Sequence, residues 1–232
     1  MATSLRVMTY NIHAGRGWDI RARSAARPRR IEPIADVIRS AAPDIVALQE
    51  VDVLADQAHE LAAHLGMELR AVASITGGNR RDYGIATLTR LPIASTREVR
   101  MPQQGHPGFR CALVTELVWE GGALDMINAH VSMMYRDRPA QAAALASAIT
   151  RSPIVVAGDF NMTPFSPAFR LLARGLASAT TLARTWPAPA PVVPIDHVLF
   201  RGLVWKSGSA WTAGGARRAS DHLPVVADFE LA

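Results

Sequence analysis

The chain has 232 residues and a formal net charge of +5; 49% of its residues are hydrophobic and 19% are charged. This composition is typical of a globular protein with a substantial core and excludes a disordered chain. A single cysteine, Cys111, excludes an internal disulfide framework and a cysteine-based zinc site. The positive balance favours anionic partners through long-range attraction without naming one.

Hydrophobic patterning predicts interleaved strands and helices. In the first half of the chain, strands are predicted at residues 5–10, 44–51 and 83–93, and helices at 31–40 and 56–67. In the second half, strands are predicted at 110–120, 122–131, 154–157, 195–200 and 220–231, and helices at 138–149 and 166–175. Gly121 and Gly122 predict a hairpin between two of these strands, and the Pro-rich residues 186–194 predict a loop.

A hairpin among strands that alternate with helices excludes a purely parallel doubly wound sheet and favours packed sheets with helices outside. No repeat or composition shift marks a boundary, so residues 1–232 are predicted to form one domain. No apolar run approaches the roughly 20 residues that span a bilayer, and the N-terminus lacks the apolar stretch of a signal peptide. We therefore expect a soluble, cytoplasmic protein, and we expect a monomer.

Polar side chains stand at six predicted strand ends, next to apolar residues. These ends carry Asn11, Glu50, Asn128 with His130, Asp159 with Asn161, Asp196, and Asp221 with His222. An ionised carboxylate in an apolar setting is costly unless it is paired or binds a cation. If the ends converge, several carboxylates share one site, and a hard divalent cation such as Mg²⁺ relieves their repulsion. Such a cation, together with imidazoles and a carboxylate base, is suited to the hydrolysis of phosphate esters.

The motifs "TYNIH", "ALQEV", "YGIATLTR", "NAH", "GDFN", "IDHV" and "SDHLPV" occur in this order. Together they resemble the motifs of the endonuclease/exonuclease/phosphatase superfamily, and the resemblance covers the chain from Met8 to Val226. It implies an α/β fold, a four-layer αββα sandwich with two central mixed, largely antiparallel sheets. It also implies a Mg²⁺- or Mn²⁺-dependent phosphoric ester hydrolase.

The resemblance implies a metal site and a substrate site. Glu50 would be the main metal ligand, Asn11 would help to orient the metal and the phosphate, and Asp221 would lie near or on the metal. Asn161 would bind the phosphoryl oxygens. We further predict that Arg217 and Arg218, with Arg21, Arg23, Arg27, Arg29 and Arg30 after the first strand, rim the mouth and attract phosphate.

The remaining implied roles are catalytic. Asp159 would position or deprotonate the attacking water, and His130 would contact the phosphate or the leaving group. His222 would bind phosphate or act as general acid or base, and Asp196 would orient it. His197 should point to the opposite side of its strand, so we interpret it as structural.

Two positions depart from the family pattern. Ile85 stands where the family often has Asn, which removes a polar contact near the site, and Ala129 stands where Thr is usual. The favoured function is phosphodiester hydrolysis, with nucleic acid and phospholipid or head-group substrates both open. The alternatives are a phosphomonoesterase of the same superfamily and a non-catalytic binding module on this fold.

Overall fold

The computed structural model describes residues 4–18, 30–75, 83–104 and 110–231. Its strands are β1 (Ser4–Asn11), β2 (Ile45–Asp52), β3 (Glu68–Ile75), β4 (Tyr83–Thr89), β5 (Ile93–Met101), β6 (Arg110–Trp119), β7 (Gly122–His130), β8 (Ile154–Asp159), β9 (Ala177–Ser178), β10 (Asp196–Arg201), β11 (Leu203–Ala210) and β12 (Val225–Leu231). Its helices are the 3₁₀ turn η1 (His13–Gly15), α1 (Glu32–Ala41), α2 (Gln57–Leu65), α3 (Arg138–Ala148), α4 (Pro167–Leu172) and α5 (Ala216–Ala219).

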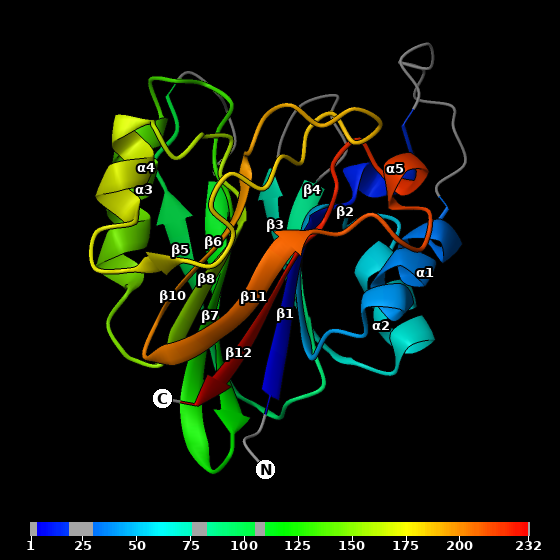
Figure 1. The fold of residues 1–232 in the computed structure, drawn as a ribbon, viewed down its shortest axis with the longest axis horizontal. Helices are drawn as coiled ribbons and strands as arrows, with labels where there is room; N and C mark the ends of the chain where they lie inside the picture. Colours follow the sequence, from blue (N-terminus) through cyan, green and yellow to red (C-terminus); the bar gives the residue numbers. More distant parts are fainter. Residues whose placement is uncertain (1–3, 19–29, 76–82, 105–109, 232) are drawn as a thin grey trace.

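Two six-stranded sheets are stacked between two groups of helices (Figure 1). The first sheet has the order β11-β12-β1-β2-β4-β3, with α1, α2 and α5 on its outer face. The second has the order β5-β6-β7-β8-β10-β9, with α3 and α4 outside it. Parallel and antiparallel pairs occur in both sheets. The four-layer αββα sandwich expected from the sequence is therefore confirmed.

The strands that patterning missed lie at sheet edges. β3, β9 and β11 were not predicted, and residues 83–93 form β4, a turn and the first residue of the edge strand β5 rather than one strand. Most side chains of β5 are exposed, so it carries no alternation of apolar and polar residues. Residues 220–224 also differ from expectation, because they form a turn before β12.

Buried amides link the two sheets just below the polar strand ends. Gln49 of β2 donates from Nε2 to Oδ1 of Asn128 on β7 at 2.9 Å. Asn128 donates back across the interface to the carbonyls of Leu48 and Ala86. Both amide side chains are fully buried, so leaving either one unpaired would cost the desolvation of its polar atoms. These bonds fix how the site-bearing ends of the two sheets face each other.

Gly158 lies where two strands approach closely. A Cβ at this position would lie 1.9 Å from the carbonyl oxygen of Ala129 on β7, which pairs with Gly158 in register. We expect Gly158→Ala to destabilise the protein by about 3 kcal/mol or more, because the backbone of β7 or β8 must shift. Urea unfolding measures the change, with Gly122→Ala as control, since a Cβ there lies 3.6 Å from its nearest neighbour. Equal stability of the two variants would contradict the expected clash.

An ion pair ties β1 to β12. Arg6 Nε lies 2.6 Å from Asp228 Oδ1, and Ser207 Oγ donates to Asp228 Oδ2. Burial alone would raise the pKa of Asp228, but the hydrogen bonds from Arg6 and Ser207 outweigh it and hold the pKa below its usual value. A depressed folded-state pKa adds stability above the unfolded pKa of about 3.9, and this stability is lost as the pH falls through the folded pKa.

We therefore expect Asp228→Asn to cost of order 1 kcal/mol at pH 6, after allowing for solvent screening of the partly exposed Arg6. The difference in unfolding free energy between wild type and variant should shrink toward zero below pH 3, because wild-type Asp228 is then also neutral. Denaturant unfolding at a series of pH values measures it. A difference that stays constant with pH would contradict this account.

Among the described residues, no helix has the length and apolar character required to cross a bilayer.

Candidate functional site

The polar strand ends meet at one edge shared by both sheets. β1 runs parallel to β2, and β7 runs parallel to β8, so each pair presents its carboxyl end at this edge. β10 runs antiparallel to β8 and begins there, with Asp196 opposite Asp159. The turn that follows α5 brings Asp221 and His222 to the same place. Side chains from distant parts of the sequence thereby come within hydrogen-bonding range.

Asp159 lies at the centre of this group and is 1% exposed. Its Oδ2 accepts a hydrogen bond from Asn11 Nδ2 at 3.0 Å and lies 3.6 Å from His130 Nε2 and 3.9 Å from His222 Nε2. Its Oδ1 accepts the backbone N–H of Asn161 at 2.9 Å. Asp159 therefore joins both sheets and faces two imidazoles.

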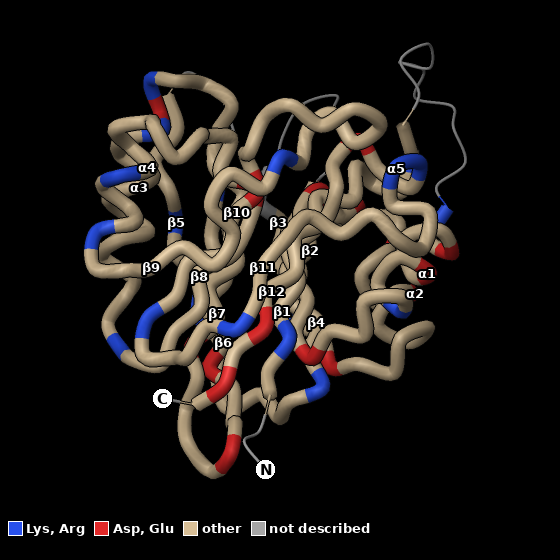
Figure 2. The backbone as a smooth tube through the Cα atoms, in the orientation of Figure 1, with Lys and Arg blue, Asp and Glu red and all other residues tan. Residues whose placement is uncertain are grey.

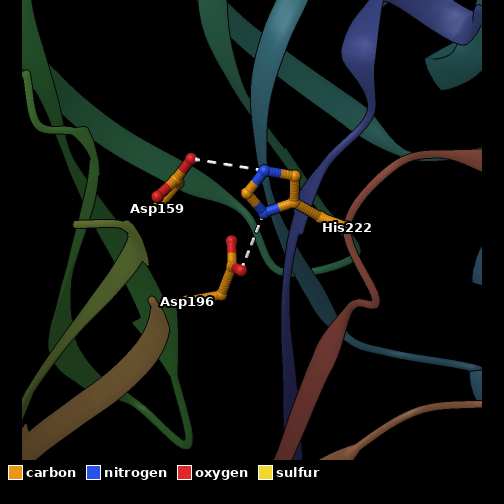
Figure 3. Close-up of side chains that lie close together, drawn as sticks. All are labelled: Asp159, Asp196 and His222. Carbon is orange, nitrogen blue, oxygen red and sulfur yellow. Dashed lines mark hydrogen bonds and ion pairs between the residues drawn. The ribbon is translucent and has the colours of Figure 1, made fainter. Parts of the chain in front are cut away.

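His222 is held between two carboxylates (Figure 3). Its Nδ1 lies 2.9 Å from Asp196 Oδ2, while Nε2 points toward Asp159. Asp196 Oδ2 also accepts a hydrogen bond from Thr185 Oγ1 at 2.5 Å, which fixes the carboxylate in turn. The three side chains of Thr185, Asp196 and His222 form a chain of contacts in which an acid orients an imidazole.

The charge on Asp159 and the charge on His222 depend on each other. Burial raises the pKa of Asp159 to about 7, Asp196 raises it too, and His222 and the hydrogen bonds from Asn11 and Asn161 oppose the rise. Burial alone would lower the pKa of His222, but the carboxylates of Asp196 and Asp159 outweigh it and hold this pKa well above its usual value. A carboxylate of raised basicity thus faces a protonated imidazole.

Glu50 reaches the edge through an irregularity in β2. The pairing of β2 with β4 shifts register between Gln49 and Val51, and Glu50 has a φ of +53°. A bulge of this kind re-aims a side chain, and positive φ is uncommon for a residue other than glycine. The half-buried Glu50 accepts a hydrogen bond at Oε1 from Asn11 Nδ2 at 3.2 Å.

Asn11 links the two acids through its nitrogen. Its Nδ2 donates to Glu50 and Asp159, and its Oδ1 accepts the backbone N–H of His13 at 3.1 Å. This network assigns the amide orientation, because a flipped amide would set two donors against each other. Asn11 thereby has the geometry of an orienting residue, with its oxygen turned away from the carboxylates.

Asp221 stands beside this network. Its Oδ1 lies 3.6 Å from His13 Nδ1 and 3.3 Å from Ser220 Oγ. The fully buried Ser220 donates its single hydroxyl proton to the Asn11 carbonyl at 2.7 Å, which ties this turn to β1. Asn161, with a φ of +50°, donates from Nδ2 to the carbonyl of Val131.

Sequence reasoning gave no role to three residues at the site: Thr185, Ser220 and Arg110. Arg110 begins β6, is 8% exposed, and donates to the carbonyl of His130 at 3.2 Å. Burial lowers its pKa, against which Asp159 and Glu50 raise it, so it lies within the field of both acids. Its Nε has no hydrogen-bond partner among the described residues. The only sequence signal is a charged residue at the start of an otherwise apolar strand.

His130 differs from His222. Burial lowers the pKa of His130 well below its usual value, and the nearby charges of Arg110 and His222 lower it further. Its Nδ1 is buried without a hydrogen-bond partner among the described residues. His130 is therefore a neutral imidazole that faces Asp159, beside a charged one.

One group of three acidic or imidazole side chains within the described ranges is compact enough to share an ion: Asp159, Asp196 and His222, whose ligand atoms lie within 4.8 Å of one another. His222 Nδ1, however, is already engaged by Asp196. Glu50 and Asp221, the metal ligands that the resemblance implies, each bring carboxylate oxygens to this edge, and oxygen donors suit Mg²⁺ or Mn²⁺ better than a set that includes an imidazole. The donors at this edge therefore fit a hard divalent cation.

Arg217 and Arg218, which were predicted to line the entrance of the site, lie on α5. Arg217 Nη1 donates to the carbonyls of Ala188 and Pro189, so it holds the Pro-rich loop. Arg218 lines a pocket of about 370 Å³ together with Arg16, Trp18 and Arg30. The other arginines predicted for this rim, Arg21, Arg23, Arg27 and Arg29, lie outside the described residues.

His197 and Ile85 both pack within the interior. His197 is fully buried, lies 2.8 Å through Nε2 from the carbonyl of Met162, and stacks with Phe160, as expected for a structural histidine. Ile85 packs with Cys111 and Leu113, so apolar contacts fill the position where an amide is often found.

Comparisons with known proteins place the chain in a family. A curated relative, Uncharacterized protein YbhP of Escherichia coli strain K12, is 28% identical over 255 residues, which covers 98% of this chain and 97% of the relative. An endonuclease/exonuclease/phosphatase from Beutenbergia cavernae has a TM-score of 0.79 at 24% identity, over 98% of this chain and 72% of its own. The mannosyl-6-phosphatase Bt3783 from Bacteroides thetaiotaomicron has a TM-score of 0.76 at 17% identity, over 97% and 99% of the two chains.

At these identities the solved structures establish the fold alone. The family assignment rests on sequence, because the model of the Endonuclease/Exonuclease/phosphatase family matches residues 8–222. That range contains the site residues from Asn11 to His222. The resemblance of the ordered motifs is thus confirmed, and the chain belongs to the Endonuclease/Exonuclease/phosphatase family.

Proposed function

We propose that this protein is a Mg²⁺- or Mn²⁺-dependent hydrolase of phosphodiester bonds. Proteins of the family generally hydrolyse phosphate esters, which supports the reaction class. The observation that carries the proposal is the placing of Asp159, a buried carboxylate that faces His130 and His222, with His222 held by Asp196. This arrangement places a carboxylate base and an imidazolium acid 3.9 Å apart at the edge where the cation-binding oxygens gather.

Glu50 and Asp221 would hold the cation, with Asn11 orienting Glu50. A bound Mg²⁺ or Mn²⁺ would neutralise charge on the phosphate and make a coordinated water more acidic. Asn11 Nδ2 also donates to Asp159, which places that carboxylate beside the proposed cation site.

Asp159 would accept the proton of the attacking water, since burial raises its basicity and Asn11 and Asn161 fix both of its oxygens. His222 would give its Nε2 proton to the leaving oxygen, and Asp196 would keep the ring in position. His130, as a neutral imidazole, and Asn161 would donate hydrogen bonds to phosphoryl oxygens.

The charge at the site, counted with its cation, supports a diester over a monoester. Four carboxylates line the edge, and Arg110, the imidazolium of His222 and a bound divalent cation would together balance their charge. A phosphodiester adds one negative charge and a monoester adds nearly two at neutral pH, so the diester disturbs this balance less. Arg110, whose Nε has no hydrogen-bond partner in the described part of the chain, would contact the phosphate, and Arg217 and Arg218 on α5 would draw it toward the site.

The test combines turnover with metal binding. The substrates are bis(p-nitrophenyl) phosphate, p-nitrophenyl phosphate, single- and double-stranded DNA, abasic DNA, RNA and phospholipids, each with Mg²⁺, Mn²⁺ or EDTA. We expect metal-dependent turnover that is faster on the diester than on the monoester. Faster monoester turnover would favour the phosphomonoesterase. Mn²⁺ binding without turnover of any phosphoester would favour the binding module.

Glu50→Gln should lower the affinity for Mn²⁺ in calorimetry by about tenfold or more, because a charged oxygen ligand is lost. Glu116→Gln is the matched control, since Glu116 is a partly buried acid on β6 that pairs with Arg151, away from this edge. If His222→Ala removes Mn²⁺ binding and Glu50→Gln does not, the cation lies in the Asp159, Asp196 and His222 group instead.

We also expect a monomer in the cytoplasm, on the grounds of the sequence.

A further inference from the structure

Four large apolar side chains protrude beside the site. Met133, Met134 and Tyr135 are 68%, 47% and 70% exposed, and Phe165 is 69% exposed. We call these four residues the apolar rim. Single exposed apolar residues are ordinary, but several on adjoining loops mark a surface that binds something.

The apolar rim adjoins the site because its two loops continue the strands that carry the site. Met133 follows His130 of β7, and Phe165 follows Asp159 of β8 and Asn161. The loops are joined at their roots, where Val131 N–H donates to the Asp159 carbonyl and Asn161 Nδ2 donates to the Val131 carbonyl, both at 2.9 Å. They lead into α3 and α4, which pack against each other.

Buried polar contacts hold the first loop in place. Ser132 Oγ donates to Asp137 Oδ2 at 2.9 Å and accepts the backbone N–H of Met134. Gln141 accepts the backbone N–H of Ser132, and Arg138 donates to the carbonyls of Ser132 and Met133. Because the backbone is fixed by these bonds, the apolar tips are held in solvent in the described structure.

The surroundings of the apolar rim are basic. Residues 131–149 and 160–176, which carry the two loops with α3 and α4, contain four arginines and one acid, Asp137. Asp137 is buried, whereas Arg136, Arg170 and Arg174 are exposed. Basic residues accordingly outnumber acidic ones along α3 and α4 in Figure 2. The guanidinium of Arg138 lies 5.8 Å from the centre of the Tyr135 ring.

We propose that the apolar rim inserts into an anionic phospholipid surface and sets the site against the lipid head groups. Side chains that are about 70% exposed are protruding tips, not walls of a cleft, so a rigid small molecule would cover little of them. The soft boundary between head groups and acyl chains can surround such tips, while arginines pair with anionic head groups. Aromatic rings with a polar end, such as Tyr135, also favour that boundary.

If the apolar rim binds lipid, the substrate is a phosphodiester within a phospholipid head group. This part of the inference rests on the proposed function. Lipid binding itself does not require turnover. The experiment therefore measures vesicle binding in EDTA, where a metal-dependent enzyme is idle, and hydrolysis of soluble bis(p-nitrophenyl) phosphate separately.

Wild-type protein is sedimented with vesicles of phosphatidylcholine alone or mixed with phosphatidylglycerol. The rim variant carries Met133→Ser, Tyr135→Ser and Phe165→Ser. The control variant carries Val204→Ser, Trp205→Ser and Leu231→Ser. These three exposed apolar residues lie where β11 begins and β12 ends, at the end of the first sheet away from the site. We expect wild type and control to bind the anionic vesicles, and the rim variant to bind about tenfold more weakly or worse. All three should hydrolyse the soluble diester equally.

Absent binding by wild type, or equal binding by the rim variant, would overturn the inference whatever the outcome of the turnover assays. Loss of soluble-diester turnover in a folded rim variant would also overturn it, because the tips would then contact the small substrate. Rim-dependent vesicle binding without hydrolysis of any phosphoester would support the lipid surface and contradict the proposed enzyme.

Discussion

Asp159→Asn is expected to lower kcat for a phosphodiester by about 10²–10⁴-fold, the range that a general base contributes. Asn keeps the shape of the side chain and can still accept the N–H of Asn161, which Asp159 Oδ1 binds at 2.9 Å. It cannot take a proton from water. Steady-state kinetics with saturating Mn²⁺ measures the effect, and calorimetry should show that Mn²⁺ still binds.

The matched control is Asp125→Asn. Asp125 is also a buried acid of the second sheet, 3% exposed, but it pairs with Ile154 at the far end of β7 and contacts Arg151. We expect its removal to leave kcat within about threefold of wild type, because it lies outside the site. An Asp159→Asn enzyme that keeps wild-type kcat would contradict the role of Asp159 as base.

Asp196→Asn and His222→Gln are each expected to lower kcat by about 10²–10³-fold, and the double variant should lose little more than either one. The reason is that Asp196 acts through His222, whose Nδ1 lies 2.9 Å from Asp196 Oδ2. Residues that act as a unit give non-additive effects in a double-mutant cycle. KM should change far less than kcat, since orientation matters most in the transition state.

Thr185→Ser tests the same unit with a conservative change. Thr185 Oγ1 donates to Asp196 Oδ2, and a serine hydroxyl can do the same. We expect Thr185→Ser to retain most of the activity and Thr185→Val to lose a large part of it.

Additive losses in the double-mutant cycle of Asp196 and His222, with unequal pH profiles of the two single variants, would show that the two residues act separately.

The candidate site was largely foreseeable, because its residues follow short apolar strands. Asn11, His130 and Asp159 each end a strand, Glu50 lies near the end of β2, and the structure brings these residues to one edge. Arg110, Thr185 and Ser220 were not foreseeable in the same way. Nothing in their local sequence shows that folding buries a guanidinium beside two acids, or sets a hydroxyl against Asp196.

The local sequence also determined the interior strands. β1, β2, β6, β7 and β8 are covered on both faces, so each is a nearly continuous apolar run that patterning detects. The paired glycines at residues 121 and 122 fixed the hairpin of β6 and β7.

Tertiary structure alone decided the sheet edges and the orientation of individual polar groups. β3, β5 and β11 are strands because they pair with β4, β6 and β12. The side chains of β5 and β11 are mostly exposed and carry no apolar pattern of their own. The oxygen of Asn11 faces a backbone N–H because two carboxylates compete for its nitrogen. A buried strand can be predicted from the sequence because its residues are apolar. The pairing of an edge strand and the direction of a side-chain hydrogen bond depend on partners that only the folded chain supplies.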